Sequence, residues 1–161
     1  MPQSSCDRLI VLFFRIAMGW TFLYAASHQL ADPNWSAASF LAHTKTFHNF
    51  FAWFTTPKVL PVTNFLVEWG HLLIGLSLIA GLAVRASAPF GALLMVVYYL
   101  AHLDFPYVDN TENFIMEFHL VYAVVLVVLI RARAGHVFGL DAVAARMAAV
   151  KRSPLLLRLV S

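Results

Sequence analysis

Four long apolar blocks constrain the fold of this chain more than any other feature. Each is long enough to cross roughly 30 Å of hydrocarbon as a helix rising about 1.5 Å per residue. Of the 161 residues, 61% are hydrophobic and only 12% are charged, whereas a soluble domain is about one quarter charged. We therefore expect an all-α integral membrane protein whose single domain is a four-helix transmembrane bundle. The predicted spans are residues 9–27, 62–84, 87–103 and 114–130.

Basic residues mark one side of this bundle. Arg8 precedes the first span, Arg85 lies between the second and third, and Arg131 and Arg133 follow the fourth. Because such residues stay in the cytoplasm, we expect both termini to be cytoplasmic, in the inner membrane of a prokaryote. The formal net charge of +3 then reflects topology and contact with membrane lipid. Nucleic acid is not an expected partner.

Two amphipathic segments lie outside the predicted spans. Residues 36–54 form a predicted helix on the outer surface, with Phe40, Phe47, Phe51 and Phe54 on one face, turned toward lipid or the bundle. After the fourth span, residues 141–152 predict an amphipathic cytoplasmic tail, whose helix Asp141 can cap.

Ionisable and polar aromatic side chains interrupt all four spans at a similar depth. Each ionisable group costs about 2.5–3.5 kcal/mol to insert and so calls for a reason. Counted from the basic residues at about 1.5 Å per residue, the layer lies roughly 18–25 Å away, in the outer half of the bilayer. It contains Tyr24, Glu68, His71, Tyr98, His102, Glu117 and His119. Arg15 lies near the cytoplasmic side, where it can snorkel into water.

The spacing of these residues predicts which of them share a helix face. Glu68 and His71 are three apart, and Tyr98 and His102 are four apart, so each pair faces one way. Glu117 and His119 are about 200° apart around a helix. The sequence leaves open which of these two points inward. These residues also have an explanation without a functional site. His102 can be a histidine at the membrane interface, and tyrosines at this depth can belong to the aromatic belt of the membrane surface.

A buried carboxylate beside histidines and tyrosines can exchange protons with a quinone while the ring stacks on aromatic side chains. We expect Glu68 to exchange the proton, with His71 as its partner and His102 in the facing wall or in a relay through His28 or Asp104 to the outer surface. The other expected binding residues are Tyr98, Tyr24, Glu117 and His119, with Phe51 and Phe54 shielding the lipid entrance.

A metal site is not predicted. Glu68 and His71 match one half of the ExxH pattern of di-iron bundles, but Glu117-Phe118-His119 has the wrong spacing for the other half. Haem ligation has no support beyond the presence of histidines.

The sequence resembles the DoxX/DoxD family of small four-helix membrane proteins over residues 10–142. The matching motifs are Arg15-x-x-x-Gly19-Trp20 leading into FLYAASHQLADPNWSAASFL, then EWGHLLIGLSLIAGLAVR, LLMVVYYLA and GHVFGLD. Residues 32–41 and the FGLD ending are similar to the DoxD-like branch. The resemblance implies the membrane subunit of a thiosulfate:quinone oxidoreductase, which passes electrons from a sulfur donor to membrane quinone. It also implies a partner, either a DoxA-type subunit or a soluble redox protein.

Two other classes of function stay open at this point. One is a non-catalytic membrane anchor or assembly factor for a redox partner, and the other is a carrier of small molecules. The sequence does not identify the electron donor, the quinone type or the oligomeric state. Whether the chain is active alone is also open.

Overall fold

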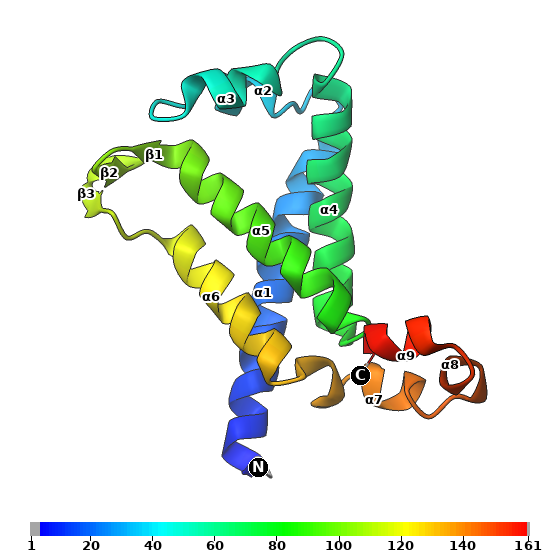
Figure 1. The fold of residues 1–161 in the computed structure, drawn as a ribbon. Helices are drawn as coiled ribbons and strands as arrows, with labels where there is room; N and C mark the ends of the chain where they lie inside the picture. The colour runs from blue at the N-terminus through cyan, green and yellow to red at the C-terminus, as the bar shows by residue number, and fades with distance from the viewer. Residues whose placement is uncertain (1–3, 161) are drawn as a thin grey trace.

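The computed structural model describes residues 4–160, which form a mostly helical molecule (Figure 1). In chain order its elements are α1 (Ser5–Ala31), α2 (Ala38–Ala42), α3 (His48–Trp53), α4 (Leu60–Ala80), α5 (Val84–His102), β1 (Leu103–Asp104), β2 (Tyr107–Val108), β3 (Asn110–Phe114), α6 (Phe118–Arg131), a 3₁₀ turn (Ala134–His136), α7 (Asp141–Ala144), α8 (Ala148–Lys151) and α9 (Pro154–Val160).

Within these residues, three helices are long and apolar enough to span a membrane, namely α1, α4 and α5. The fourth predicted span is shorter than expected. Residues 110–114 form β3, so α6 begins at Phe118 and its 14 residues cover about 21 Å. The all-α prediction is therefore corrected by a small antiparallel sheet with the strand order β1-β2-β3. Helix α4 also ends earlier than predicted, because Gly81 takes a left-handed conformation at φ 64°.

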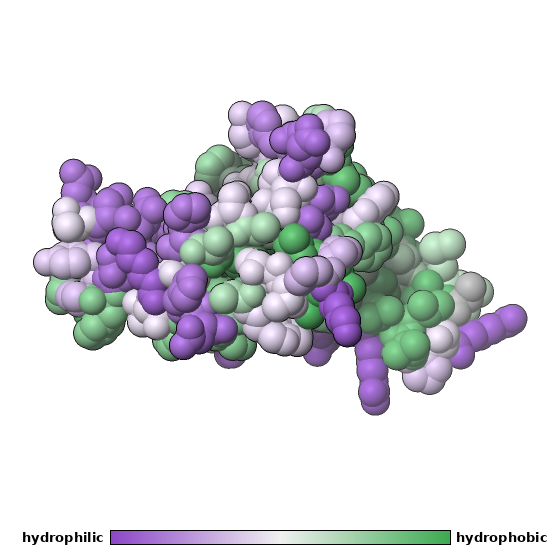
Figure 2. Space-filling model, turned by 90° about the horizontal axis from the view of Figure 1, so that it is seen from above, coloured by the Kyte–Doolittle hydropathy of each residue, from purple (hydrophilic) through white to green (hydrophobic). Residues whose placement is uncertain are grey.

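Helices α1 and α4 pack along each other, as do α5 and α6. A Cβ added at Gly75 would lie 2.7 Å from the Leu23 side chain, so this small residue lets α1 approach α4 closely. Large apolar side chains such as Phe13, Trp20 and Phe90 stay exposed on the outside, as contact with lipid requires. Figure 2 shows hydrophilic residues gathered on the side of the sheet and hydrophobic surface exposed elsewhere.

The continuous helix predicted over residues 36–54 is wrong, because the segment forms two short helices, α2 and α3. Local hydrogen bonds compete with the helix where α2 ends: the Thr44 hydroxyl donates to the Leu41 carbonyl at 2.9 Å. The two helices lie across one end of the bundle and form a roof (Figure 1). Asn64 Oδ1 accepts from the Ala37 amide at 3.0 Å and fixes the roof to α4. At its other end, the Thr46 amide donates to the Leu103 carbonyl at 3.1 Å.

Arg15 does not snorkel to the surface. It is only 2% exposed, and its Nη1 donates to the carbonyl oxygens of Ala134 at 2.7 Å and Val137 at 2.8 Å. Its Nη2 donates to the Phe138 carbonyl at 3.3 Å. Arg15 therefore fastens α1 to the segment that follows α6.

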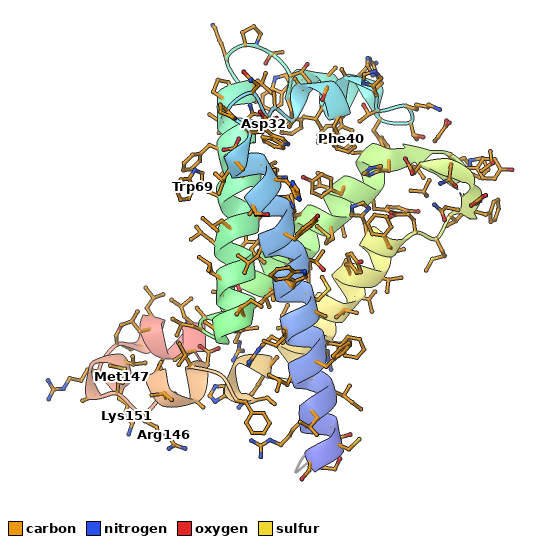
Figure 3. The ribbon with its side chains drawn as sticks, turned by 180° about the vertical axis from the view of Figure 1, so that it is seen from behind. Asp32, Phe40, Trp69, Arg146, Met147 and Lys151 are labelled. Atoms are coloured by element: carbon orange, nitrogen blue, oxygen red, sulfur yellow. The ribbon has the colours of Figure 1, made fainter. Side chains whose placement is uncertain are left out.

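Asp141 does not cap its own helix as predicted. Its carboxylate accepts from the backbone amides of Ala83 at 2.6 Å and Val84 at 3.3 Å, and so caps α5. Burial raises the pKa of Asp141, while these hydrogen bonds and the nearby His136 and Arg15 oppose that rise. The tail predicted as one helix over residues 141–152 is instead α7 and α8. Arg146, Met147 and Lys151 point away from the bundle (Figure 3).

Replacing Arg15 with methionine should lower the free energy of unfolding by about 3–5 kcal/mol, because two buried carbonyls, the partly buried carbonyl of Phe138 and the carboxylate of Asp141 lose their cationic partner. Thermal unfolding of the purified protein in detergent measures this. Arg146→Met, on the exposed tail, is the matched control and should unfold like the wild type. An Arg15→Met protein as stable as this control would show that Arg15 does not stabilise the contact between α1 and the segment after α6.

Replacing Asp141 with alanine should cost about 1–3 kcal/mol, because it leaves the Ala83 and Val84 amides at the start of α5 without an acceptor. The same unfolding assay applies, with Glu112→Ala in the exposed strand β3 as the control. Equal stability of the two variants would show that Asp141 does not cap α5.

Candidate functional site

A cavity of about 590 Å³ lies beneath the roof. We call it the main cavity. Phe40, Phe51 and Phe54 line it from above, and α4 and α5 supply apolar walls. Its polar lining includes Gln29 from α1, Tyr98 and His102 from α5, and His119 from α6. A mostly apolar cavity of this size with a few converging polar groups is typical of small-molecule sites.

Four aromatic rings form a stack beside this cavity. The ring centroids of His71 and Tyr98 are 5.7 Å apart, those of Tyr98 and His119 are 5.4 Å apart, and those of His119 and His102 are 4.9 Å apart. The planes of successive rings are inclined by only 23–28°. Phe40 of the roof lies 4.8 Å from His102 (Figure 3). Three helices and the roof therefore meet at one set of rings.

Helix periodicity explains how the rings come together. Tyr98 and His102 are four residues apart and face the same way from α5. His71 shares the buried face of α4 with Ile74 and Leu78. His119 is the second residue of α6 and is buried.

Hydrogen bonds at Nδ1 assign the protonation of the three stacked histidines. His71 Nδ1 lies 2.8 Å from the Val67 carbonyl, and His102 Nδ1 lies 2.8 Å from the Tyr98 carbonyl. Because a carbonyl oxygen can only accept, Nδ1 carries the hydrogen in both rings. His119 Nδ1 lies 2.9 Å from both carboxylate oxygens of Glu117. Each Nε2 is left with no partner among residues 4–160 and can exchange a proton with a ligand.

Glu117 and His119 both point inward, so the expectation that only one of them would do so is wrong. Glu117 is 6% exposed and His119 is 9% exposed. The helical 200° separation does not apply, because Glu117 is the N-cap of α6 with an extended backbone at φ −151° and ψ 165°. Its carboxylate accepts from the His119 backbone amide at 2.9 Å as well as from the ring. The buried carboxylate of Glu117 therefore fixes the orientation of the His119 ring.

Two of the predicted site residues lie elsewhere. Glu68 is half-buried about 60° around α4 from His71. It does not line the main cavity, and it makes no hydrogen bond or ion pair with any residue that the structure describes. Tyr24 is 56% exposed on the outer face of α1, where its ring lies 4.6 Å from that of His28. Phe51 and Phe54, predicted to shield the entrance, line the roof of the cavity.

Gln29 was not predicted as a site residue. It lines both the main cavity and a smaller adjoining cavity of about 170 Å³, in which His71 also lies. Its Oε1 is buried without a hydrogen-bond partner within residues 4–160. A signal for Gln29 exists in the sequence, because Arg15, Phe22 and Gln29 recur every seven residues along the inner face of α1.

The stacked histidines do not form a metal-ligand cluster with other side chains. Across the described residues, no group of three or more His, Cys, Asp or Glu side chains is placed to hold a metal ion. The two carboxylate oxygens of Glu117 meet one imidazole, and the other rings lie face to face.

Residues 10–103 match the model of the DoxX family. Comparisons with the curated proteins and with the solved structures found no match. The matched residues include most of α1, all of α2–α5 and therefore Gln29, His71, Tyr98 and His102; they end before Glu117 and His119. The DoxD-like branch stays a prediction. With three apolar helices of spanning length and a family match over more than half of its residues, the chain is a membrane protein that belongs to the DoxX family.

Proposed function

We propose that the main cavity binds the head group of a membrane quinone, and that this chain is the quinone-interacting subunit of a membrane oxidoreductase. The observation that carries the proposal is the ring stack, because its members Tyr98, His102 and His119 line an apolar cavity between membrane helices. In this proposal α6 is the fourth span, the β1–β3 sheet lies at the outer surface, and both termini are cytoplasmic in a prokaryotic inner membrane.

The residues around the main cavity fit a quinone head group. Such a group is a flat ring with two carbonyl oxygens that accept hydrogen bonds, and its reduced form donates through two hydroxyls. Phe40, Tyr98 and Phe118 offer ring faces on which it can stack. Gln29 offers an amide that accepts through Oε1 or donates through Nε2. When bound, the quinone takes up two electrons and two protons to become the quinol.

His119 and Glu117 hold one of these protons. The Nδ1–H of His119 donates to the Glu117 carboxylate, which orients the ring and can take up the Nδ1 proton when Nε2 exchanges a proton with a ligand. Its Nε2–H then serves as the donor to a ligand oxygen in the main cavity. Proton donation by a positioned histidine is a common form of general acid catalysis. This pair replaces Glu68 as the proton-exchanging group that the geometry favours.

His102 connects the main cavity with the outer side. It lines the main cavity and also a polar cavity of about 270 Å³, whose other lining residues include His43, Lys45, Asp104 and Asp109. Because an imidazole has two ring nitrogens, one of which can accept a proton while the other donates one, His102 can pass a proton between the two spaces. Of the relay residues expected from the sequence, His102 and Asp104 line this route. His28 lies on the exposed face of α1.

Electrons reach the quinone from a partner in this proposal. The resemblance to the DoxD-like branch suggests thiosulfate as the donor and a DoxA-type subunit or a soluble redox protein as the carrier. The chain itself contributes binding, orientation and proton transfer. A DoxX protein that only anchors such a partner would not need a cavity with unpartnered proton-exchanging groups.

Replacing His119 with phenylalanine keeps a ring in the stack and removes its Nε2. Binding of a short-chain quinone should weaken about tenfold, as for the loss of one charge-assisted hydrogen bond. Quinone reduction by the assembled oxidoreductase should fall at least about a hundredfold. Binding is followed in lipid nanodiscs through quenching of tryptophan fluorescence, because Trp35 lines the main cavity.

His28→Phe and Glu68→Gln serve as controls, since both residues lie outside the main cavity. Both variants should bind and reduce quinone like the wild type. Loss of activity in Glu68→Gln with normal activity in His119→Phe would return the proton site to Glu68. Absence of quinone binding by the folded wild type would favour the anchor or assembly role.

A further inference from the structure

A further hollow lies on the lipid side of the bundle, between α4 and α5. This groove has a volume of about 410 Å³, and its walls are formed mainly by Leu66, Leu73, Phe90, Leu93, Leu94 and Val97. Leu73, Phe90 and Leu93 are each about 60% exposed or more. Ser87 also lines the groove, and its hydroxyl is hydrogen-bonded to that of Ser77 at 2.6 Å. The groove therefore presents hydrocarbon to its occupant.

The groove adjoins the main cavity. Leu66, Leu94 and Val97 line both spaces. From Val97 the groove extends along α5 to Ser87, about 15 Å at 1.5 Å per residue. A flexible hydrocarbon chain can thus leave the main cavity between α4 and α5 and follow α5 toward the opposite end of the bundle.

Gly70 keeps this groove open. A Cβ added there would meet no atom of another described element within 4 Å. By contrast, a Cβ at Gly19 would lie 2.9 Å from the Ile79 side chain, and one at Gly75 would lie 2.7 Å from Leu23. Gly19 and Gly75 thus permit close helix packing, whereas Gly70 borders space that the described residues do not fill.

We propose that the groove binds the isoprenoid tail of the quinone whose head group occupies the main cavity. This inference rests on the proposed function and extends it to the class of substrate, a quinone with a long polyprenyl chain. The acyl chains of bilayer lipids also fit an apolar groove. A tail joined to the ring favours the quinone, because the groove and the cavity adjoin at Leu66, Leu94 and Val97, so that one molecule can occupy both.

Binding at the two places is separable by experiment. Quinones that carry either no tail or a tail of several isoprene units are titrated into nanodiscs that contain the protein, and their affinities are compared at equal mole fraction in the lipid. Occupancy of the main cavity is again followed by fluorescence, in a protein whose Trp20, Trp53 and Trp69 are replaced by phenylalanine so that Trp35 alone reports. The tailed quinone should bind the wild type about tenfold more tightly, because linked occupancy of two adjoining sites raises affinity.

Gly70→Phe should abolish this tenfold preference by filling the groove, while affinity for the tailless quinone stays unchanged. Leu76→Phe is the matched control, since it adds the same ring on an exposed face of α4 outside the groove and should keep the preference. A tailed quinone with a photoreactive group near the end of its tail should label residues 87–97 in the wild type. That label should disappear in Gly70→Phe.

Three results would overturn the tail assignment. The wild type could bind both quinones equally, Gly70→Phe could retain the full preference, or the photoreactive tail could label lipid and other helices instead of residues 87–97. In each case, normal binding of the tailless quinone would leave the proposed function intact and assign the groove to bilayer lipid. Failure of the folded wild type to bind either quinone would overturn both proposals.

Discussion

The buried guanidinium of Arg15 fixes the end of the molecule opposite the main cavity. It joins α1 to the carbonyls of residues 134, 137 and 138, while Asp141 from the same segment caps α5 beside the α4–α5 turn. The guanidinium lies against Gly139 of the FGLD stretch and Gly81 of the turn, and the Asp141 carboxylate lies against Gly135. One buried cationic group thus holds the first helix, the chain after the last long helix and the central turn at one point.

Because the helices are held together at that end of the bundle, α4 and α5 can separate at the end beneath the roof. Helices α4 and α5 are only a three-residue turn apart at residues 81–83, and Figure 1 shows them diverging from this turn toward the roof. The main cavity lies where the helices have separated, and the two short helices α2 and α3 cover it. The groove beside Gly70 lies between the same diverging helices. Both spaces therefore follow from one geometric feature, a bundle fastened at one end.

Much of this arrangement could be predicted from the sequence, and the exceptions have physical causes. Apolar length and the spacing of His71, Tyr98 and His102 predicted helices that meet in a polar layer. Counting along ideal helices failed at Glu117, because an N-cap residue has an extended backbone and its side chain turns back on its own helix. Depth in the membrane also does not determine the direction in which a side chain points, and neither Glu68 nor Tyr24 lines the main cavity. Arg15 was misjudged because its partners are backbone carbonyls far along the chain, for which side-chain patterns give no signal.

Polar groups within membrane helices are costly unless they are paired, and the pairing here is selective. Every Nδ1 in the stack donates to a nearby carbonyl or carboxylate, so the rings are held in place by bonds within their own helices or, for His119, by the helix cap. The Nε2 atoms have no such partners among the described residues. If these rings served only to stabilise the packing of the helices, apolar aromatic rings would be sufficient, because they stack without leaving a nitrogen unpaired. The combination of fixed ring orientation with free Nε2 atoms is instead what proton exchange with a bound ligand requires, and it is the reason to look for chemistry at these histidines before Glu68.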